Sequence, residues 1–183
     1  MDKKIRLLQV IPRLDVGGAE TGCKDIAQFI ADQNYFSAIL SAGGQQIKNI
    51  DQTKIKIFKF SVHTKNPFMI FFNIFVILFI VLFYKINIIH VRSRAPAWSC
   101  YFASKLLGVS LISTFHGTYN FNNHLKKFYN SVMLRGNSVI AGSKFILFLL
   151  TNFFKCLAFL LLIFDINPLR KIIVVKLLLL INL

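Results

Sequence analysis

Residues 5–31 read IRLLQVIPRLDVGGAETGCKDIAQFIA, and this stretch contains three features in a set order. The short apolar run that ends at Pro12 predicts a buried strand. Gly17 and Gly18 follow in a loop, and from Ala19 onward apolar residues recur at the spacing of a helix. A strand, a glycine loop and a helix in this order form the first unit of a parallel α/β sheet.

The same alternation of strand and helix continues to about residue 144. Short apolar runs that end at glycine or proline predict strands, and longer periodic runs predict helices. Parallel strands need helical connections, so the pattern predicts an α/β fold with helices on both faces of a parallel sheet. The expected strands are 5–12, 36–41, 55–60, 86–91, 109–115 and 138–141, and the expected helices are 19–31, 68–84, 96–107 and 122–134.

Three apolar segments, 68–84, 145–164 and 172–183, have to be considered as membrane spans. The first is at the lower limit for crossing a bilayer, the second is interrupted by polar residues, and the third is too short. Because the strands on either side of 68–84 are expected in one sheet, this segment is predicted to be a helix on the sheet. Its outer side either packs against protein or lies on a membrane surface.

The chain is strongly basic, with 22 Lys and Arg against 7 Asp and Glu in 183 residues and a formal net charge of +15. Residues 67–144 hold no carboxylate side chain. This suggests a partner with negative charge, such as anionic lipid, a phosphorylated sugar or nucleic acid. An AT-rich genome, which enriches Lys, Asn, Ile and Phe, is the alternative explanation. The three cysteines include no C-x-x-C pair and support neither a disulfide framework nor a zinc ribbon.

The loop with Gly17 and Gly18 is a candidate anion-binding site. Glycine lets the backbone approach a ligand closely, and the following helix start offers free N–H groups to an anion. The pair does not match the G-x-G-x-x-G dinucleotide pattern. A plain tight turn between strand and helix is the alternative, and Glu20 in the first helical turn is explained by the helix dipole alone.

His116, Arg92 and Arg94 follow two other strands at the same carboxyl edge, where open α/β sheets bind ligands. His116 could polarise a hydroxyl or contact a phosphate, and the arginines could hold a phosphate or carboxylate. Ordinary loop residues are the alternative. No histidine spacing predicts a metal site, and no helix-turn-helix, zinc finger or RNA-binding pattern indicates nucleic acid.

Four separated blocks together resemble a known family. They are residues 10–20 (VIPRLDVGGAE), 89–98 (IHVRSRAPAW), 113–119 (STFHGTY) and 139–143 (VIAGS). In this order and spacing they resemble the N-terminal, acceptor-side domain of bacterial family 4 glycosyltransferases with the GT-B fold, closest to enzymes of lipopolysaccharide core and other surface glycans. The resemblance covers roughly residues 4–144 and implies that the sheet is Rossmann-like.

The resemblance also implies a reaction. A sugar would pass from a nucleotide-sugar to a glycan or lipid acceptor, with retention of configuration, no obligatory metal and no cofactor beyond the donor substrate. Gly17 and Gly18 would approach the donor diphosphate, and His116 would be the catalytic residue near the transferred sugar. Arg92, Arg94 and Ser143 would line the acceptor side of the cleft. The enzyme would be cytoplasmic and peripheral to the inner membrane, on anionic lipid.

Residues 145–183 depart from the family. They are mostly apolar, contain no Gly, Ser or Glu, and match the family only faintly at 165–175. We therefore expect a domain at 1–144 and an apolar, helical tail at 145–183 that holds the last helix and strand of the domain. A frameshift or truncation before the donor-binding domain would leave the chain inactive alone. The alternatives are a bipartite enzyme completed by a second polypeptide, and a non-catalytic membrane-anchored protein.

Overall fold

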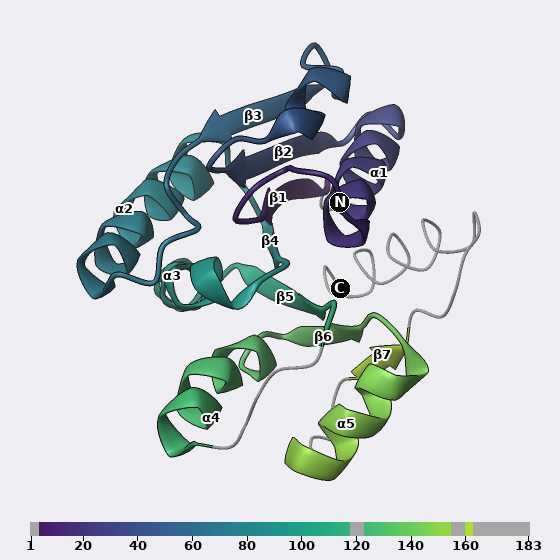
Figure 1. The fold of residues 1–183 in the computed structure, drawn as a ribbon. Helices are drawn as coiled ribbons and strands as arrows, with labels where there is room; N and C mark the ends of the chain where they lie inside the picture. The colour runs from purple at the N-terminus through teal and green to yellow at the C-terminus, as the bar shows by residue number, and fades with distance from the viewer. Residues whose placement is uncertain (1–3, 118–122, 155–159, 163–183) are drawn as a thin grey trace.

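The computed structural model describes residues 4–117, 123–154 and 160–162. Its centre is a parallel sheet with the strand order β3-β2-β1-β4-β5-β6-β7. The chain adds β2 and β3 on one side of β1, then returns to place β4 on the other side of β1 and continues outward to β7 (Figure 1). The strands are β1 (Arg6–Val10), β2 (Phe36–Ser41), β3 (Ile55–Lys59), β4 (Ile88–Val91), β5 (Ser110–Phe115), β6 (Ser138–Ala141) and β7 (Leu160–Leu162).

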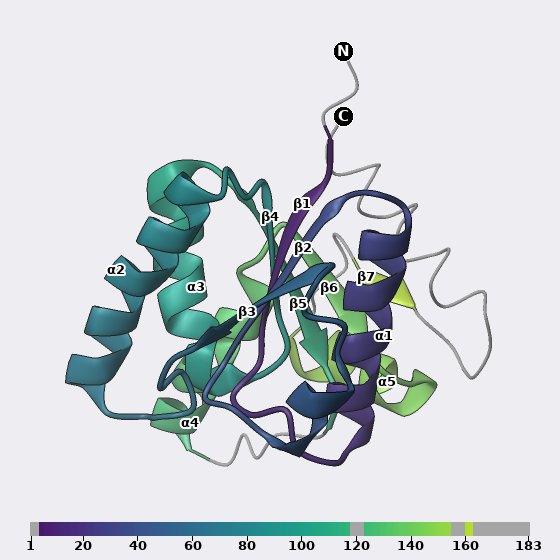
Figure 2. The same ribbon diagram turned by 90° about the horizontal axis from the view of Figure 1, so that it is seen from above.

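Helices connect the strands and cover both faces of the sheet, as the sequence predicts. In Figure 2, α1 lies on one side of the strands, whereas α2 and α3 lie on the other. This is the arrangement that right-handed crossovers produce when the strand order reverses. The helices are α1 (Gly18–Asp32), α2 (Pro67–Phe83), α3 (Arg94–Leu107), α4 (His124–Ser131) and α5 (Lys144–Phe154), with 3-10 turns η1 (Gln45–Asn49) and η2 (Val132–Leu134).

The two faces of the sheet have separate cores because successive side chains of a strand point to opposite sides. Leu7 and Ile88 pack with Ile26 and Ile30 of α1. The strand residues between these, such as Leu8, point to the opposite face and pack under the other helices. Residues of that second core include Val10, Ile89, Val91, Leu111, Phe115, Ile77, Ile80, Cys100, Ala103, Ile146 and Leu150.

Helix α2 confirms the prediction for 68–84. Strands β3 and β4 on either side of it belong to one sheet, and α2 packs Ile77, Ile80 and Val81 into the core. Asn73, its one polar residue, is buried and donates from Nδ2 to the Ser61 carbonyl. Within the described ranges, no helix combines the length and hydropathy needed to cross a membrane.

Two helices, α3 and α4, differ from the prediction by more than one residue at a boundary. Helix α3 begins at Arg94, so Pro96 is the third residue of its first turn. The predicted helix 122–134 is divided into α4 and η2, and the backbone tightens into a 3-10 turn from Val132 onward. Gly108 ends α3 in the left-handed conformation at φ 65°, which a glycine adopts without strain.

Beyond residue 144 the structure describes α5 and β7. Strand β7 pairs in parallel with β6, and Ile146 and Leu150 of α5 join the core shared by α2 and α3. The described part of segment 145–183 therefore contains most of helix α5 and the short strand β7. The segments 155–159 and 163–183, including the faint match at 165–175, lie outside the described residues. The boundary at 144 and the origin of the tail stay predictions.

Candidate functional site

The predicted site residues all lie at or just beyond the carboxyl ends of strands. Gly17 and Gly18 follow β1, Arg92 and Arg94 follow β4, His116 follows β5 and Ser143 follows β6. These four strands are parallel and consecutive in the sheet, in the order β1-β4-β5-β6. The sheet thus brings residues from four separate loops to one edge, which is the ligand-binding edge of open α/β folds.

The glycine pair forms the start of α1. Gly17 precedes the helix in an extended conformation, and Gly18 is its exposed first residue, with no atom within 4 Å of the place where a Cβ would lie. A Cβ on Gly17 would meet the Glu20 carboxylate at 2.4 Å, which is a flexible side chain. Among the described residues, no side chain caps this helix start. Its first N–H groups are therefore available to an anion, as in other helix N-termini that bind phosphate.

The loop before the glycine pair is held by a second glycine pair, Gly43 and Gly44, which follows β2. The Leu14 N–H donates to the Gly43 carbonyl at 2.7 Å. Gly44 has φ 141°, and a Cβ there would lie 2.3 Å from the Leu14 carbonyl carbon. Only glycine fits this close approach, so the 43–44 turn fixes the course of the chain into α1.

A layer of buried polar side chains lies under the N-terminal half of α1. Gln9 and His90 are paired residues of β1 and β4, both buried. His90 Nε2 and Thr114 Oγ1 are hydrogen-bonded at 2.7 Å. Gln9 donates from Nε2 to the Cys23 carbonyl of α1 at 2.8 Å. Near the carboxyl edge of the sheet, this face is therefore lined by polar side chains, whereas farther from the edge it is lined by apolar ones.

Arg92 completes this layer and is buried, with 5% of its surface exposed. It donates from Nε to Gln9 Oε1 at 2.9 Å and from Nη2 to the Gly22 carbonyl at 3.2 Å. A Cβ on Gly22 would lie 3.4 Å from Nη1, so this glycine lets the guanidinium pass close to the helix. In this structure Arg92 ties α1 to β1 from below rather than extending from the edge.

His90 is held neutral by this environment. Burial is the main cause that lowers its pKa well below 6.5, and the positive charges of Arg92 and His116 lower it further. Its Nδ1 atom has no hydrogen-bond partner among the described residues. The same environment raises the pKa of the buried Cys23 thiol to about 11, mainly through burial. Both groups therefore serve as neutral polar or apolar groups at ordinary pH.

His116 is the half-buried residue directly after β5, next to the exposed Gly117. It contributes, after burial and Arg92, to lowering the pKa of His90. Arg94 is also half-buried, and it donates from Nη1 to Asn130 Oδ1 at 3.0 Å, which links α3 to α4. The edge therefore offers the imidazole of His116 directly after β5 and a guanidinium that is hydrogen-bonded to α4.

Ser143 has a structural task in the described chain. Its Oγ accepts from the Ile146 N–H at 3.2 Å and so caps α5. The preceding Gly142 donates its N–H to the Phe115 carbonyl at 2.9 Å, and a Cβ there would lie 2.8 Å from the same oxygen. The prediction singled out Ser143, but the close approach that aligns β6 with β5 is made by Gly142.

In the part of the chain that the structure describes, no three His, Cys, Asp or Glu side chains gather as metal ligands would. The edge presents three features. The start of α1 can bind an anion, His116 offers an imidazole, and Arg92 and Arg94 are hydrogen-bonded to other parts of the protein.

The sequence pattern described as Glycosyltransferase Family 4 matches residues 16–156. The chain belongs to this family. A search of curated proteins finds no match. The matched range includes every predicted site residue, from Gly17 to Ser143.

Solved structures agree with the family assignment. A glycosyltransferase from Rickettsia africae superposes with a TM-score of 0.76 at 32% identity, over 94% of this chain and 49% of that one. The Anabaena protein Alr3699/HepE, solved with UDP and glucose, has a TM-score of 0.65 at 15% identity over 92% and 50%. A sucrose-phosphate synthase structure from Thermosynechococcus elongatus has a TM-score of 0.64 at 11% identity over 90% and 49%. The last two show the fold alone.

The family 4 chain thus has the α/β, Rossmann-like architecture of GT-B glycosyltransferases, and it spans about half the length of these solved relatives. Sequence reasoning did not find the contribution of Gln9. Its one signal was a polar residue that interrupts the apolar run of the first strand. A polar residue in an apolar run does not reveal its role until the hydrogen-bond partner of its buried amide is known.

Proposed function

We propose that this chain is the acceptor-side half of a glycosyltransferase that moves a sugar from a nucleotide-sugar to a lipid-linked or lipopolysaccharide-type acceptor. The observation that carries the proposal is that His116 and the uncapped start of α1 both follow strands at the same carboxyl edge of a family 4 domain. The Anabaena relative, solved with UDP-glucose, supports a nucleotide-sugar as the donor class.

Each residue at the edge has a role in this proposal. The N–H groups that follow Gly17 and Gly18 stabilise negative charge on the donor diphosphate. His116 lies beside the transferred sugar, where it orients a hydroxyl or stabilises charge in the transition state. Arg92 acts as a positioning residue, because its bonds to Gln9 and Gly22 hold α1 against the sheet. Arg94 and Ser143 position α4 and α5 beside the acceptor.

Sugar transfer in this proposal needs a second domain that clamps the nucleotide and neutralises the leaving diphosphate. Residues 1–183 alone are then expected to give no turnover. The enzyme works in the cytoplasm at the inner membrane, where the absence of carboxylates from residues 67–144 favours contact with anionic lipid.

A chimera tests the proposal. Residues 1–154 are joined to the remaining half of the Rickettsia africae glycosyltransferase, which is 32% identical over 94% of this chain and matches it over 49% of its own length. Both this chimera and the 183-residue chain are incubated with labelled nucleotide-sugars and membrane lipid extract. We expect label in the lipid fraction only with the chimera, and only for some nucleotide-sugars.

Turnover by the 183-residue chain alone would contradict the need for a second domain. A folded chimera that binds nucleotide-sugar but transfers no label to any lipid or glycan fraction would contradict the acceptor class. The parent Rickettsia africae protein, assayed in parallel, is the control for an active second half.

A further inference from the structure

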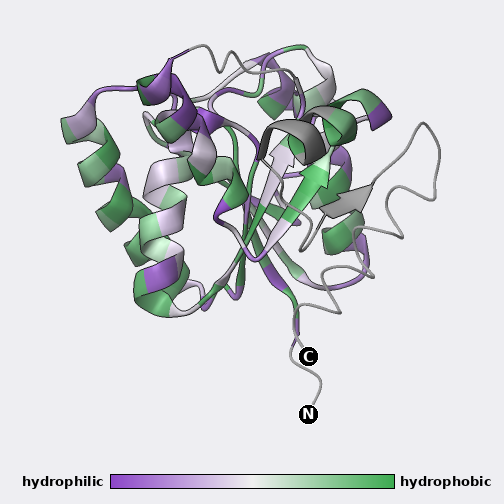
Figure 3. Ribbon diagram, turned by 90° about the horizontal axis from the view of Figure 1, so that it is seen from below, coloured by the Kyte–Doolittle hydropathy of each residue, from purple (hydrophilic) through white to green (hydrophobic). Residues whose placement is uncertain are grey.

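Helix α2 has an unusual outer surface. Its inner side is fixed to the domain by Ile77, Ile80 and Val81 in the core and by the Ser99 hydroxyl, which donates to the Ile70 carbonyl. Its outer side nevertheless carries large apolar side chains that are 53% to 85% exposed. They are Phe68, Phe71, Phe72, Phe75, Phe79, Leu82 and Phe83. Figure 3 shows α2 hydrophobic along almost its whole length.

These residues form one continuous stripe, which we call the α2 stripe. Their spacing of three and four residues places them on the same side of the helix, and some of their rings contact each other, as in the pairs Phe71–Phe75 and Phe79–Phe83. A helix that is hydrophobic all round is normally buried in a core or a membrane. Here the fold buries one side only, so the stripe needs a partner outside the described chain.

The composition of the α2 stripe favours lipid over protein. The only polar side chain of α2, Asn73, faces inward, so the outer side offers no side-chain hydrogen bond. Protein interfaces of ordinary size contain about one hydrogen bond per 100–200 Å² and a polar rim. Hydrocarbon needs no such bonds, and a helix that lies in the membrane interface buries its apolar side about 5–10 Å deep.

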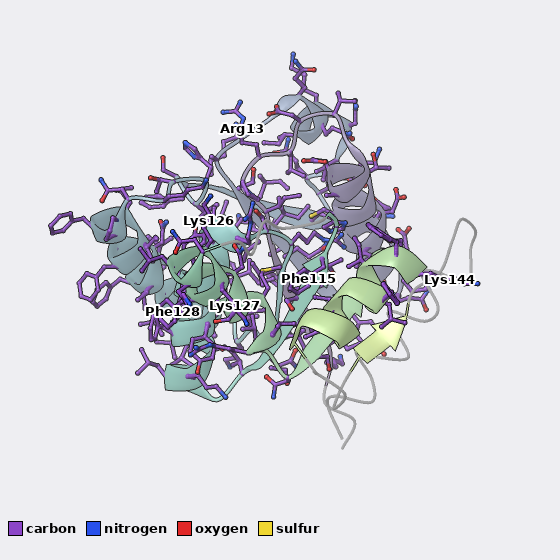
Figure 4. All side chains as sticks on the ribbon, turned by 60° about the horizontal axis from the view of Figure 1, so that its bottom comes forward. Arg13, Phe115, Lys126, Lys127, Phe128 and Lys144 are labelled. Atoms are coloured by element: carbon purple, nitrogen blue, oxygen red, sulfur yellow. The ribbon has the colours of Figure 1, made fainter. Side chains whose placement is uncertain are left out.

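Charge around the stripe is complementary to an anionic bilayer. Exposed Lys65 and Lys85 flank the two ends of α2. Helix α4 packs against α3 through Phe128 and Trp98, and it carries exposed Lys126 and Lys127, which are labelled in Figure 4. No carboxylate occurs between residues 67 and 144 to oppose this attraction.

We infer that the α2 stripe, with the lysines of α4, is a membrane-docking surface that inserts phenylalanine side chains into an anionic bilayer. The inference rests on the membrane setting of the proposed function and names the surface responsible. Both α2 and α4 begin at the carboxyl edge of the sheet, since each follows the carboxyl end of a strand. Docking through them brings the edge with His116 near the lipid surface, where a lipid-linked acceptor resides.

Vesicle sedimentation of the full 183-residue chain tests the surface. With phosphatidylglycerol–phosphatidylcholine vesicles, Phe75→Ser/Phe79→Ser is expected to lower the partition coefficient about tenfold or more. The matched control is Phe145→Ser/Phe148→Ser on α5, where the two rings are 60% and 63% exposed, and it is expected to stay within about twofold of the original. Lys126→Gln/Lys127→Gln is expected to weaken binding at least fivefold on anionic vesicles and little on pure phosphatidylcholine.

A fluorescence probe gives a second measurement that does not depend on loss of binding. Trp98 is the single tryptophan, so Trp98→Phe provides a silent background. In that background Phe75→Trp is expected to be quenched by brominated lipid, whereas Phe145→Trp is not. Circular dichroism checks that each variant is folded.

Equal binding by Phe75→Ser/Phe79→Ser and the original chain, or an unquenched Phe75→Trp, would overturn the inference. So would a dimer in solution that dissociates when the α2 stripe is changed, because the occupant would then be a second copy. The vesicle result is separate from sugar transfer. Absence of transfer by the chimera with intact vesicle binding would therefore contradict the proposed function and leave the docking surface standing.

Discussion

Arg92 donates from Nε to the side-chain oxygen of Gln9 at 2.9 Å, and both side chains are buried beneath α1. The two residues are 83 positions apart in the sequence and come from adjacent strand ends. Gln9 in turn donates to the Cys23 carbonyl, and Arg92 donates to the Gly22 carbonyl. The pair therefore holds two consecutive carbonyl groups of the helix whose first residues form the proposed anion site.

A double-mutant cycle measures this relationship. Arg92→Met is expected to lower the free energy of unfolding by about 2–4 kcal/mol, because it leaves the Gln9 oxygen buried without its donor. Gln9→Met is expected to cost a similar amount. The double variant should cost about 1–3 kcal/mol less than the sum of the two, measured by urea denaturation. Strict additivity would show that the two side chains do not stabilise each other.

Gly142 should not tolerate a methyl group. Gly142→Ala would place Cβ 2.8 Å from the Phe115 carbonyl oxygen, which is backbone and cannot move aside freely. We expect a loss of roughly 1–3 kcal/mol in the free energy of unfolding. Gly18→Ala is the control, since no atom lies within 4 Å of that Cβ position, and it should be neutral or slightly stabilising. Equal effects of both substitutions in denaturant titrations would contradict this interpretation.

Burial of His90 should make stability depend on pH. Its pKa lies well below 6.5 in the folded chain, because of burial, Arg92 and His116, whereas the unfolded imidazole titrates near 6.5. Below pH 6.5 the unfolded state binds the extra proton. The free energy of unfolding should therefore fall as pH falls from about 6.5, by at most about 1.4 kcal/mol per pH unit from this group.

Denaturant titrations between pH 5.5 and 7.5 measure this slope. His90→Gln should flatten it, whereas His124→Gln, on the exposed surface of α4, should leave it unchanged. An identical slope in His90→Gln and the original chain would assign the pH dependence to another group.

His116 is expected to act in transfer rather than in folding. In the active chimera, His116→Ala should lower the turnover rate by roughly 10²- to 10⁴-fold, as expected for a residue that moves a proton or stabilises charge. Thermal unfolding should change little. His63→Ala, at an exposed position between β3 and α2, is the control. Full activity of His116→Ala would remove this residue from the proposed mechanism.

Local patterns predicted most of the fold. The strand 36–41 was predicted to its last residue, and the helix predicted to end at residue 107 does end there, before Gly108. Both depend on nearby residues only, namely the apolar run before Gly43 and the left-handed conformation that glycine permits. The helix predicted for 122–134 was wrong at its end, because a 3-10 turn and a helix have almost the same periodicity in three residues.

By itself, the sequence determined that helices and strands alternate and that the glycine pair and His116 end up at one edge. Periodicity and chain order suffice for this, since parallel strands share a direction. Only the tertiary structure decided that Arg92 lies buried on Gln9 and that the phenylalanines of α2 face outward. Both depend on which face of the sheet each neighbouring helix covers, and that follows from long-range packing that no single segment encodes.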